Sequence, residues 1–77
     1  MKVYVDGLPI PNTNEWWCEE GWTVFDLKAD VVKIMTSKMS NPDSFYMQYE
    51  GNTLQNEQLL SDILSEGDHV TIGIVGL

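Results

Sequence analysis

Two runs of alternating apolar and polar residues, one at each end of the chain, most constrain the fold. Residues 1–6 are apolar at the odd positions, and residues 69–75 place aliphatic side chains at every second position. This period of two is typical of strands with one buried face. Because both runs are strongly apolar on that face, we expect them to pair in parallel at the centre of a sheet. The predicted inward side chains are those of Met1, Val3, Val5, Val70, Ile72 and Ile74.

The residues after the first run predict a hairpin. Residues 7–12 contain a glycine and two prolines, a composition typical of a turn. Residues 13–19 resume an extended, aromatic-rich segment that returns antiparallel to the first strand. In this second strand we expect Trp16 and Cys18 to point inward and Trp17 to remain exposed.

An amphipathic helix is predicted over residues 24–38. Thr23 caps its N-terminus in this interpretation, and Asp26 completes a variant of the capping box. The Asn-Pro-Asp sequence at residues 41–43 prevents the helix from continuing. The predicted apolar face of the helix consists of Leu27, Val31, Ile34 and Met35.

The C-terminal half predicts a second hairpin and a short helical turn. Residues 45–49 are strand-like in composition, and Gly51 with Asn52 gives a tight turn into residues 53–54. Residues 59–64 predict one helical turn that plugs an end of the core. Residues 66–68 then turn the chain into the last strand.

Together these elements predict one α+β domain over residues 1–77, with the order ββαββ. We expect a mixed sheet whose hairpins flank the two central strands and whose one face is covered by the helix. A domain of this size buries only about 60% of its unfolded surface, which leaves one modest core. An internal active-site cavity is therefore not expected.

Several short motifs resemble the ubiquitin-like family, in an order and spacing that cover nearly the whole chain. They are the opening strand, the helix start, the Pro-Asp turn after the helix, the aromatic-x-Gly-x-x-Leu turn and the Leu-Ser-Asp turn, at residues 1–5, 23–29, 42–43, 49–54 and 60–62. The resemblance implies the β-grasp fold of that family.

The docking face of ubiquitin is where this sequence departs from the family. The resemblance places a protein-binding surface around Tyr4, Leu8, Gln48, Thr71 and Gly73, and of the family's apolar docking residues only the leucine is retained. Nothing in the sequence restores the apolar area that glutamine and glycine remove, so we expect standard ubiquitin receptors to bind poorly. A different surface built from aromatic residues is an alternative, although packing is the more common role of such residues. Its members would be Trp17, Trp22, Phe25 and Tyr46.

The end of the chain differs from a conjugating tail. Residues Val75, Gly76 and Leu77 replace the Gly-Gly terminus that family members use for activation, so we expect no standard conjugation. Lys28 matches the helix lysine of ubiquitin, whereas the main chain-building positions carry Asn52 and Glu66. Polyubiquitin-like linkage through lysines of this domain is therefore not expected.

Few residues are candidates for a catalytic or metal-binding role. Cys18 is a candidate thioester nucleophile, but its inward position favours a buried thiol. His69 is interpreted as a surface residue, and the acidic cluster of Glu15, Glu19 and Glu20 as a solvated surface. Asp62 and Glu66 are four residues apart, but the turn that contains them is too short to indicate a catalytic pair. We therefore expect no enzymatic activity, no cofactor and no metal site.

Charge limits the partners. Lys and Arg number 4 against 12 Asp and Glu, and the net charge of −8 repels nucleic acids and anionic membranes. It favours a basic partner. A single cysteine, with no leader and no long apolar run, predicts a soluble, monomeric, cytoplasmic protein.

The function expected from these observations is that of a non-catalytic ubiquitin-like module. One hypothesis is an N-terminal head of a longer polypeptide, such as a basic ribosomal protein, with a ribosome-associated or nuclear location. The acidic head would shield the basic segment before assembly. An adaptor domain that binds a partner through the sheet surface and a truncated ubiquitin-like modifier are the alternatives.

Overall fold

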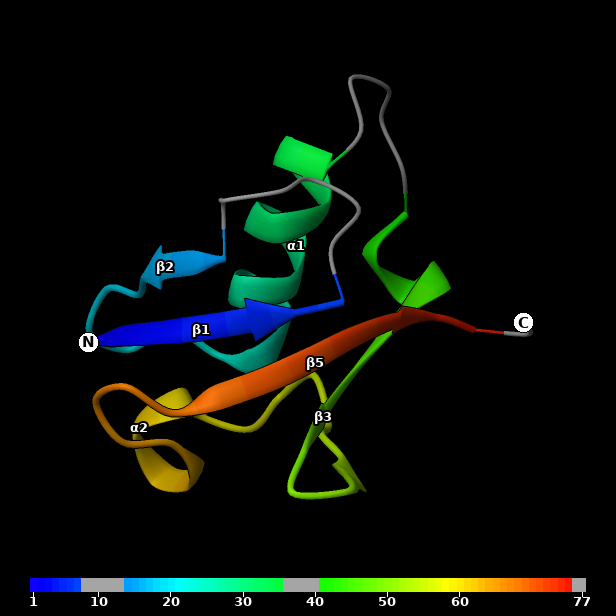
Figure 1. Cartoon of the computed structure of the whole chain (residues 1–77). Helices are drawn as coiled ribbons and strands as arrows, with labels where there is room; N and C mark the ends of the chain where they lie inside the picture. Colours follow the sequence, from blue (N-terminus) through cyan, green and yellow to red (C-terminus); the bar gives the residue numbers. More distant parts are fainter. Residues whose placement is uncertain (8–13, 36–40, 76–77) are drawn as a thin grey trace.

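The centre of the sheet is the parallel pair of β1 (Lys2–Asp6) and β5 (His69–Ile74), with Val5 opposite Val70. The strand order is β2-β1-β5-β3-β4, and all other neighbours are antiparallel. Figure 1 shows β1 and β5 side by side, with the start of β1 and the end of β5 at opposite ends of the sheet. The predicted parallel pairing and the flanking hairpins are confirmed.

The computed structural model describes residues 1–7, 14–35 and 41–75. The predicted first turn after Gly7, the predicted helix residues after Met35, and the last two residues lie outside these ranges. Five strands, two helices and one 3₁₀ turn are present in the described ranges, one strand more than the predicted order ββαββ contains. The elements not yet introduced are β2 (Glu15–Trp17), α1 (Val24–Met35), the 3₁₀ turn η1 (Pro42–Ser44), β3 (Phe45–Tyr49), β4 (Asn52–Thr53) and α2 (Leu60–Ile63).

The core lies between α1 and one face of the sheet. Val3 and Val5 of β1 are fully buried, and so are Leu27 and Val31 of α1. Burial alternates along β1 and β5 as the sequence predicts. Trp16 and Cys18 are buried and Trp17 is exposed, which confirms the predicted orientation of the second strand. The remaining buried apolar residues are Val24, Val32, Phe45, Met47, Leu60, Leu64, Val70 and Ile72.

Two residues predicted to be inward are exposed instead. Ile34 is 53% exposed and Ile74 is 46% exposed. At about 100° per residue, Ile34 lies at the edge of the buried stripe of α1, whose middle runs through Val24 and Val31. Ile74 is the last residue of β5 and pairs with the first residue of β3, at the end of the sheet.

The start of α1 is held by the predicted reciprocal cap. The Asp26 amide donates to Thr23 Oγ1 at 3.3 Å, and the Thr23 amide donates to Asp26 Oδ2 at 2.9 Å. Each carboxylate or hydroxyl oxygen thereby satisfies an amide that lacks a partner within the helix. Thr23 also forms an isolated bridge to Leu59, which ties the helix start to the segment before α2.

The short helix α2 closes one end of the core. Its Leu60 and the following Leu64 are buried, and the Leu64 amide donates to the Leu60 carbonyl at 2.8 Å. The predicted helical turn at this position is confirmed. The described residues thus form a small α+β domain with a five-stranded mixed sheet and two helices. Neither helix in the described ranges combines the length and apolarity needed to cross a bilayer.

Leu27→Ala and Ile34→Ala on the same helix test the assignment of the core. Leu27→Ala should destabilise the domain by about 2–5 kcal/mol, because it leaves a cavity among buried side chains. Ile34→Ala should cost less than about 1 kcal/mol, since over half of Ile34 is already in water. Urea unfolding followed by circular dichroism measures both. Equal losses of stability would contradict this assignment.

Candidate functional site

The sheet face that points away from α1, called the outer face below, gathers most of the predicted binding residues. Alternation along the strands places Tyr4, Gln48, Thr71 and Gly73 on it together. Gln48 lies opposite Thr71 across the β3–β5 pair. Leu8, the fifth predicted residue, lies outside the described ranges. The other outer-face side chains are those of Lys2, Asp6, Glu15, Trp17, Tyr46 and His69.

A stacked aromatic pair occupies the middle of the outer face. The rings of Tyr4 and His69 lie with centroids 4.7 Å apart and planes 19° apart. The pair follows from the strand register, because Tyr4 on β1 is directly opposite His69 on β5. The Nδ1 atom of His69 also lies 3.0 Å from Asp6 Oδ2. His69 is thus an exposed residue with two defined contacts, which the sequence interpretation of a simple surface histidine missed.

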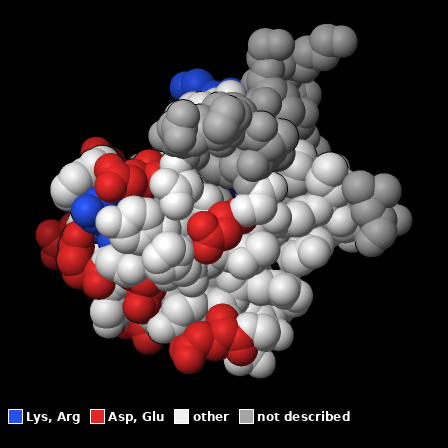
Figure 2. Space-filling view, viewed as in Figure 1, with Lys and Arg blue, Asp and Glu red and all other residues white. Residues whose placement is uncertain are grey.

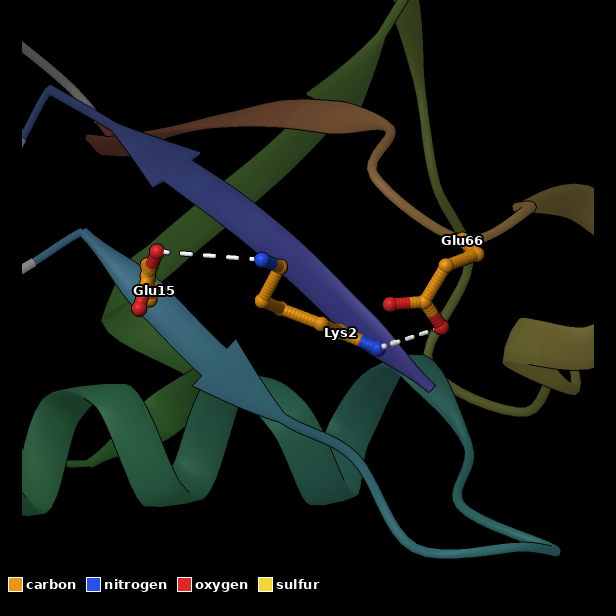
Figure 3. A network of polar contacts seen from close by, with 3 residues as sticks. All are labelled: Lys2, Glu15 and Glu66. Carbon is orange, nitrogen blue, oxygen red and sulfur yellow. Dashed lines mark hydrogen bonds and ion pairs between the residues drawn. The ribbon is translucent and has the colours of Figure 1, made fainter.

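Lys2 connects the stacked pair to Trp17. Its ammonium lies 5.3 Å from the centroid of Tyr4 and 5.7 Å from that of Trp17, within the range of cation–π attraction. Figure 3 shows that Lys2 also pairs with Glu15 at 3.8 Å, while its backbone amide donates to Glu66 Oε1 at 3.0 Å. The pKa of Lys2 is raised chiefly by its hydrogen bonding and charge interaction with Tyr4, and less by the charge of Glu15. Lys2 therefore stays charged between the two rings.

The Tyr46 ring covers Gly73, which changes the interpretation of this glycine. The two residues are paired across β3 and β5, and a Cβ atom added to Gly73 would lie 2.4 Å from the ring. The ring thus occupies space that a larger side chain at position 73 would need. The prediction that nothing nearby restores apolar area at this position is wrong, because an aromatic ring from the neighbouring strand provides it.

The four aromatic residues proposed as an alternative surface are divided between different parts of the domain. Trp17 is 69% exposed on the outer face, and Tyr46 is half-buried on the same face. Trp22 is packed against the core, and Phe25 belongs to α1. The structure therefore places two of the four on the same sheet face as the predicted surface around Tyr4.

Cys18 is a buried thiol. Burial raises its pKa to about 11 from the ordinary value of 9.0, so the nucleophilic thiolate is disfavoured. The acidic residues near it do not converge: Glu15 pairs with Lys2, while Glu19 and Glu20 belong to the turn before α1. No group of three metal-ligating side chains occurs within the described ranges.

Lys28 and Val75, which the resemblance to the ubiquitin-like family singled out, both form hydrogen bonds within the domain. Lys28 is buried and donates from Nζ to the Phe45 carbonyl at 3.2 Å, and burial lowers the pKa of its amine. The Val75 amide donates to the Ser44 carbonyl at 2.9 Å, which extends the pairing of β5 by one residue. Gly76 and Leu77 lie outside the described ranges.

Figure 2 shows acidic side chains gathered over the left and lower parts of the view. Three lysines lie in the described ranges, and of these Lys28 is buried and Lys2 is paired with Glu15. Lys33, near the end of α1, is exposed.

A scan against protein-family models matched no family, and a search of curated proteins found no match.

A double-mutant cycle at Gly73 and Tyr46 tests the ring-over-glycine contact. In the Tyr46→Ala background, Gly73→Ala should stabilise the domain by about 0.5–1 kcal/mol, because alanine suits a strand better than glycine. In the wild type this gain should be lost or reversed, since the new methyl group must displace the ring. Urea unfolding of the four proteins gives the coupling energy. Equal effects in both backgrounds would show that the ring does not cover Gly73.

The raised pKa of Cys18 predicts a pH dependence of stability. Because the folded protein favours the neutral thiol, this contribution is complete below about pH 9 and is lost as the pH rises toward 11. The Cys18→Ala variant should therefore show a shallower loss of stability over this window than the wild type. Tyr49 also adds a loss of stability at high pH, because its hydrogen bond to Asp68 raises its pKa to about 12. This contribution is the same in both proteins and does not affect their difference. Parallel pH profiles from urea unfolding would refute the prediction.

Proposed function

We propose that this chain is a non-catalytic, ubiquitin-like β-grasp module that binds a protein partner through the outer face of its sheet. The observation that carries the proposal is the row of ring systems on that face. The rings lie on four adjacent strands. Trp17 is on the edge strand β2, the Tyr4–His69 stack joins β1 to β5, and the Tyr46 ring on β3 covers Gly73.

The arrangement of elements supports the β-grasp part of the proposal. A parallel central pair joins the first strand to the last, hairpins flank it, and one long helix crosses a single face. The motifs that resemble the ubiquitin-like family lie in β1, at the start of α1, in η1, around β4 and in α2. The buried, protonated thiol of Cys18 supports a non-catalytic role, because a nucleophilic cysteine needs access and a lowered pKa.

The chemistry of the outer face supports binding to a protein. Tryptophan and tyrosine contribute much of the energy at protein interfaces, because they bury large rigid surfaces with few torsions to order. Trp17 exposes 69% of its surface, so a partner that covers it gains apolar burial. On this face the Lys2 ammonium lies beside Glu15 and the His69 ring contacts Asp6, so these charged side chains already have partners. The partner that fits is therefore a protein surface with apolar and aromatic side chains.

A second candidate function is that of an acidic head that shields a basic polypeptide, such as a ribosomal protein. The net charge of −8 favours it. A role based on charge alone would not depend on the aromatic residues of the outer face. The two candidates therefore predict different responses to substitutions there.

Photo-crosslinking from the outer face tests the proposed function. A photoreactive phenylalanine placed at Thr71 should capture one protein partner in cells, and the same partner should be captured from position 17. The Trp17→Ser substitution should lower capture from position 71 at least about fivefold, because it removes a central aromatic contact.

The matched control carries the photoreactive residue at Ile34, which is exposed on α1. Circular dichroism shows whether each variant retains its fold. Capture from position 34 as strong as from position 71, or capture that the Trp17→Ser substitution does not change, would refute binding through the outer face and favour the role based on charge.

A further inference from the structure

A pocket of about 240 Å³ lies where the start of β1, the turn before α1 and the start of α2 meet. Its apolar walls come from Met1, Cys18, Trp22 and Leu60. Pockets that hold small molecules usually enclose about 300–1,000 Å³. This pocket is therefore of a size for one side chain of a partner.

Backbone hydrogen bonds hold the walls of the pocket in place. The Cys18 amide donates to the Met1 carbonyl at 2.8 Å, and the N-terminal amine donates to the Cys18 carbonyl at 3.0 Å. The Trp22 amide donates to the Glu19 carbonyl at 3.2 Å, and the Leu60 amide donates to the Trp22 carbonyl at 3.0 Å. The three segments are thus connected, so the pocket exists before any partner binds.

Glu19 and Glu20 line the same pocket, and both are exposed. Gly21 has a φ of +86°, which allows the turn that places the two glutamates beside the apolar walls. Neither glutamate forms an ion pair within the described ranges. Two carboxylates exceed the single charge of the N-terminal amine, which already donates to Cys18. The pocket therefore combines an apolar base with a net negative charge.

We infer that this pocket binds an arginine side chain from a basic protein segment. The aliphatic stem of arginine would cover Leu60, and its planar guanidinium would stack on Trp22 while it donates to the Glu19 and Glu20 carboxylates. Arginine suits the site better than lysine, because its fork of donors engages carboxylates in pairs and it gives up its hydration more readily. The net charge of −8 attracts such a segment to the domain.

This site is separate from the outer face. Alternation along the sheet places Val3 and Trp16, and with them the neighbouring Met1 and Cys18, on the side of the helix. The inference therefore goes beyond the proposed function, and either can fail without the other. Together they describe a domain with an aromatic surface on one side and a cation pocket at one end.

Titration of the ¹⁵N-labelled protein with a blocked Ala-Arg-Arg-Ala peptide tests the inference by NMR. The largest shift changes should fall on the Gly21 amide and the Trp22 indole and should saturate with a dissociation constant near about 1 mM, as for a single-residue contact. The Glu19→Gln/Glu20→Gln variant should bind about tenfold more weakly, since it removes both charge-assisted contacts. The same peptide with citrulline in place of arginine should bind equally weakly to the wild type.

The matched control is Glu50→Gln/Glu57→Gln, which makes the same change in net charge at two exposed glutamates outside the pocket. It should retain the affinity of the wild type to within about twofold, because neither glutamate lines the pocket or can contact a bound guanidinium directly. Three results would overturn the inference. They are equal weakening by both double variants, binding of the citrulline peptide to the wild type as tight as that of the arginine peptide, or shift changes that map to the outer face. The last result would leave the proposed function intact.

Discussion

The parallel pairing of β1 with β5 is the interaction on which the rest of the structure depends. It joins residues such as Tyr4 and His69 from opposite ends of the chain. Closing so long a loop costs entropy, which the burial of Val3, Val5 and Val70 offsets. The hairpins and α1 then pack around the pair. A slip of one residue would turn the apolar side chains outward and the polar ones into the core, so the buried valines specify the register.

The same register assembles the outer face. Tyr4 meets His69 and Gln48 meets Thr71 only because the first and last strands are neighbours in the sheet. No segment of the sequence contains this surface, and its rings come from four strands. The Tyr46 ring over Gly73 belongs to the same arrangement, since a larger residue on β5 would push the ring away. The stability of the core and the composition of the candidate binding surface therefore have a common origin.

Local patterns in the sequence predict most of the fold. Alternation identifies the inward faces of the strands, and the spacing of Thr23 and Asp26 identifies the helix start, because these signals depend on neighbouring residues. Burial at the ends of elements is less predictable, as Ile34 and Ile74 show. The candidate site was predicted in part: periodicity places Tyr4 and Thr71 outward. The stack with His69 and the ring over Gly73 depend on the residue-by-residue register between distant strands, which the predicted pairing alone does not give.

Charge is distributed differently over the two candidate surfaces, and this difference bears on what each can bind. On the outer face, Lys2 pairs with Glu15 and the His69 ring contacts Asp6, so a neutral aromatic partner meets charged groups that already have contacts. At the pocket, Glu19 and Glu20 have no such partners within the described ranges. A cation that enters the pocket therefore gains two contacts without breaking an existing one. An acidic domain whose outer-face charges already have contacts attracts basic segments to the pocket and leaves the aromatic surface free for a second contact.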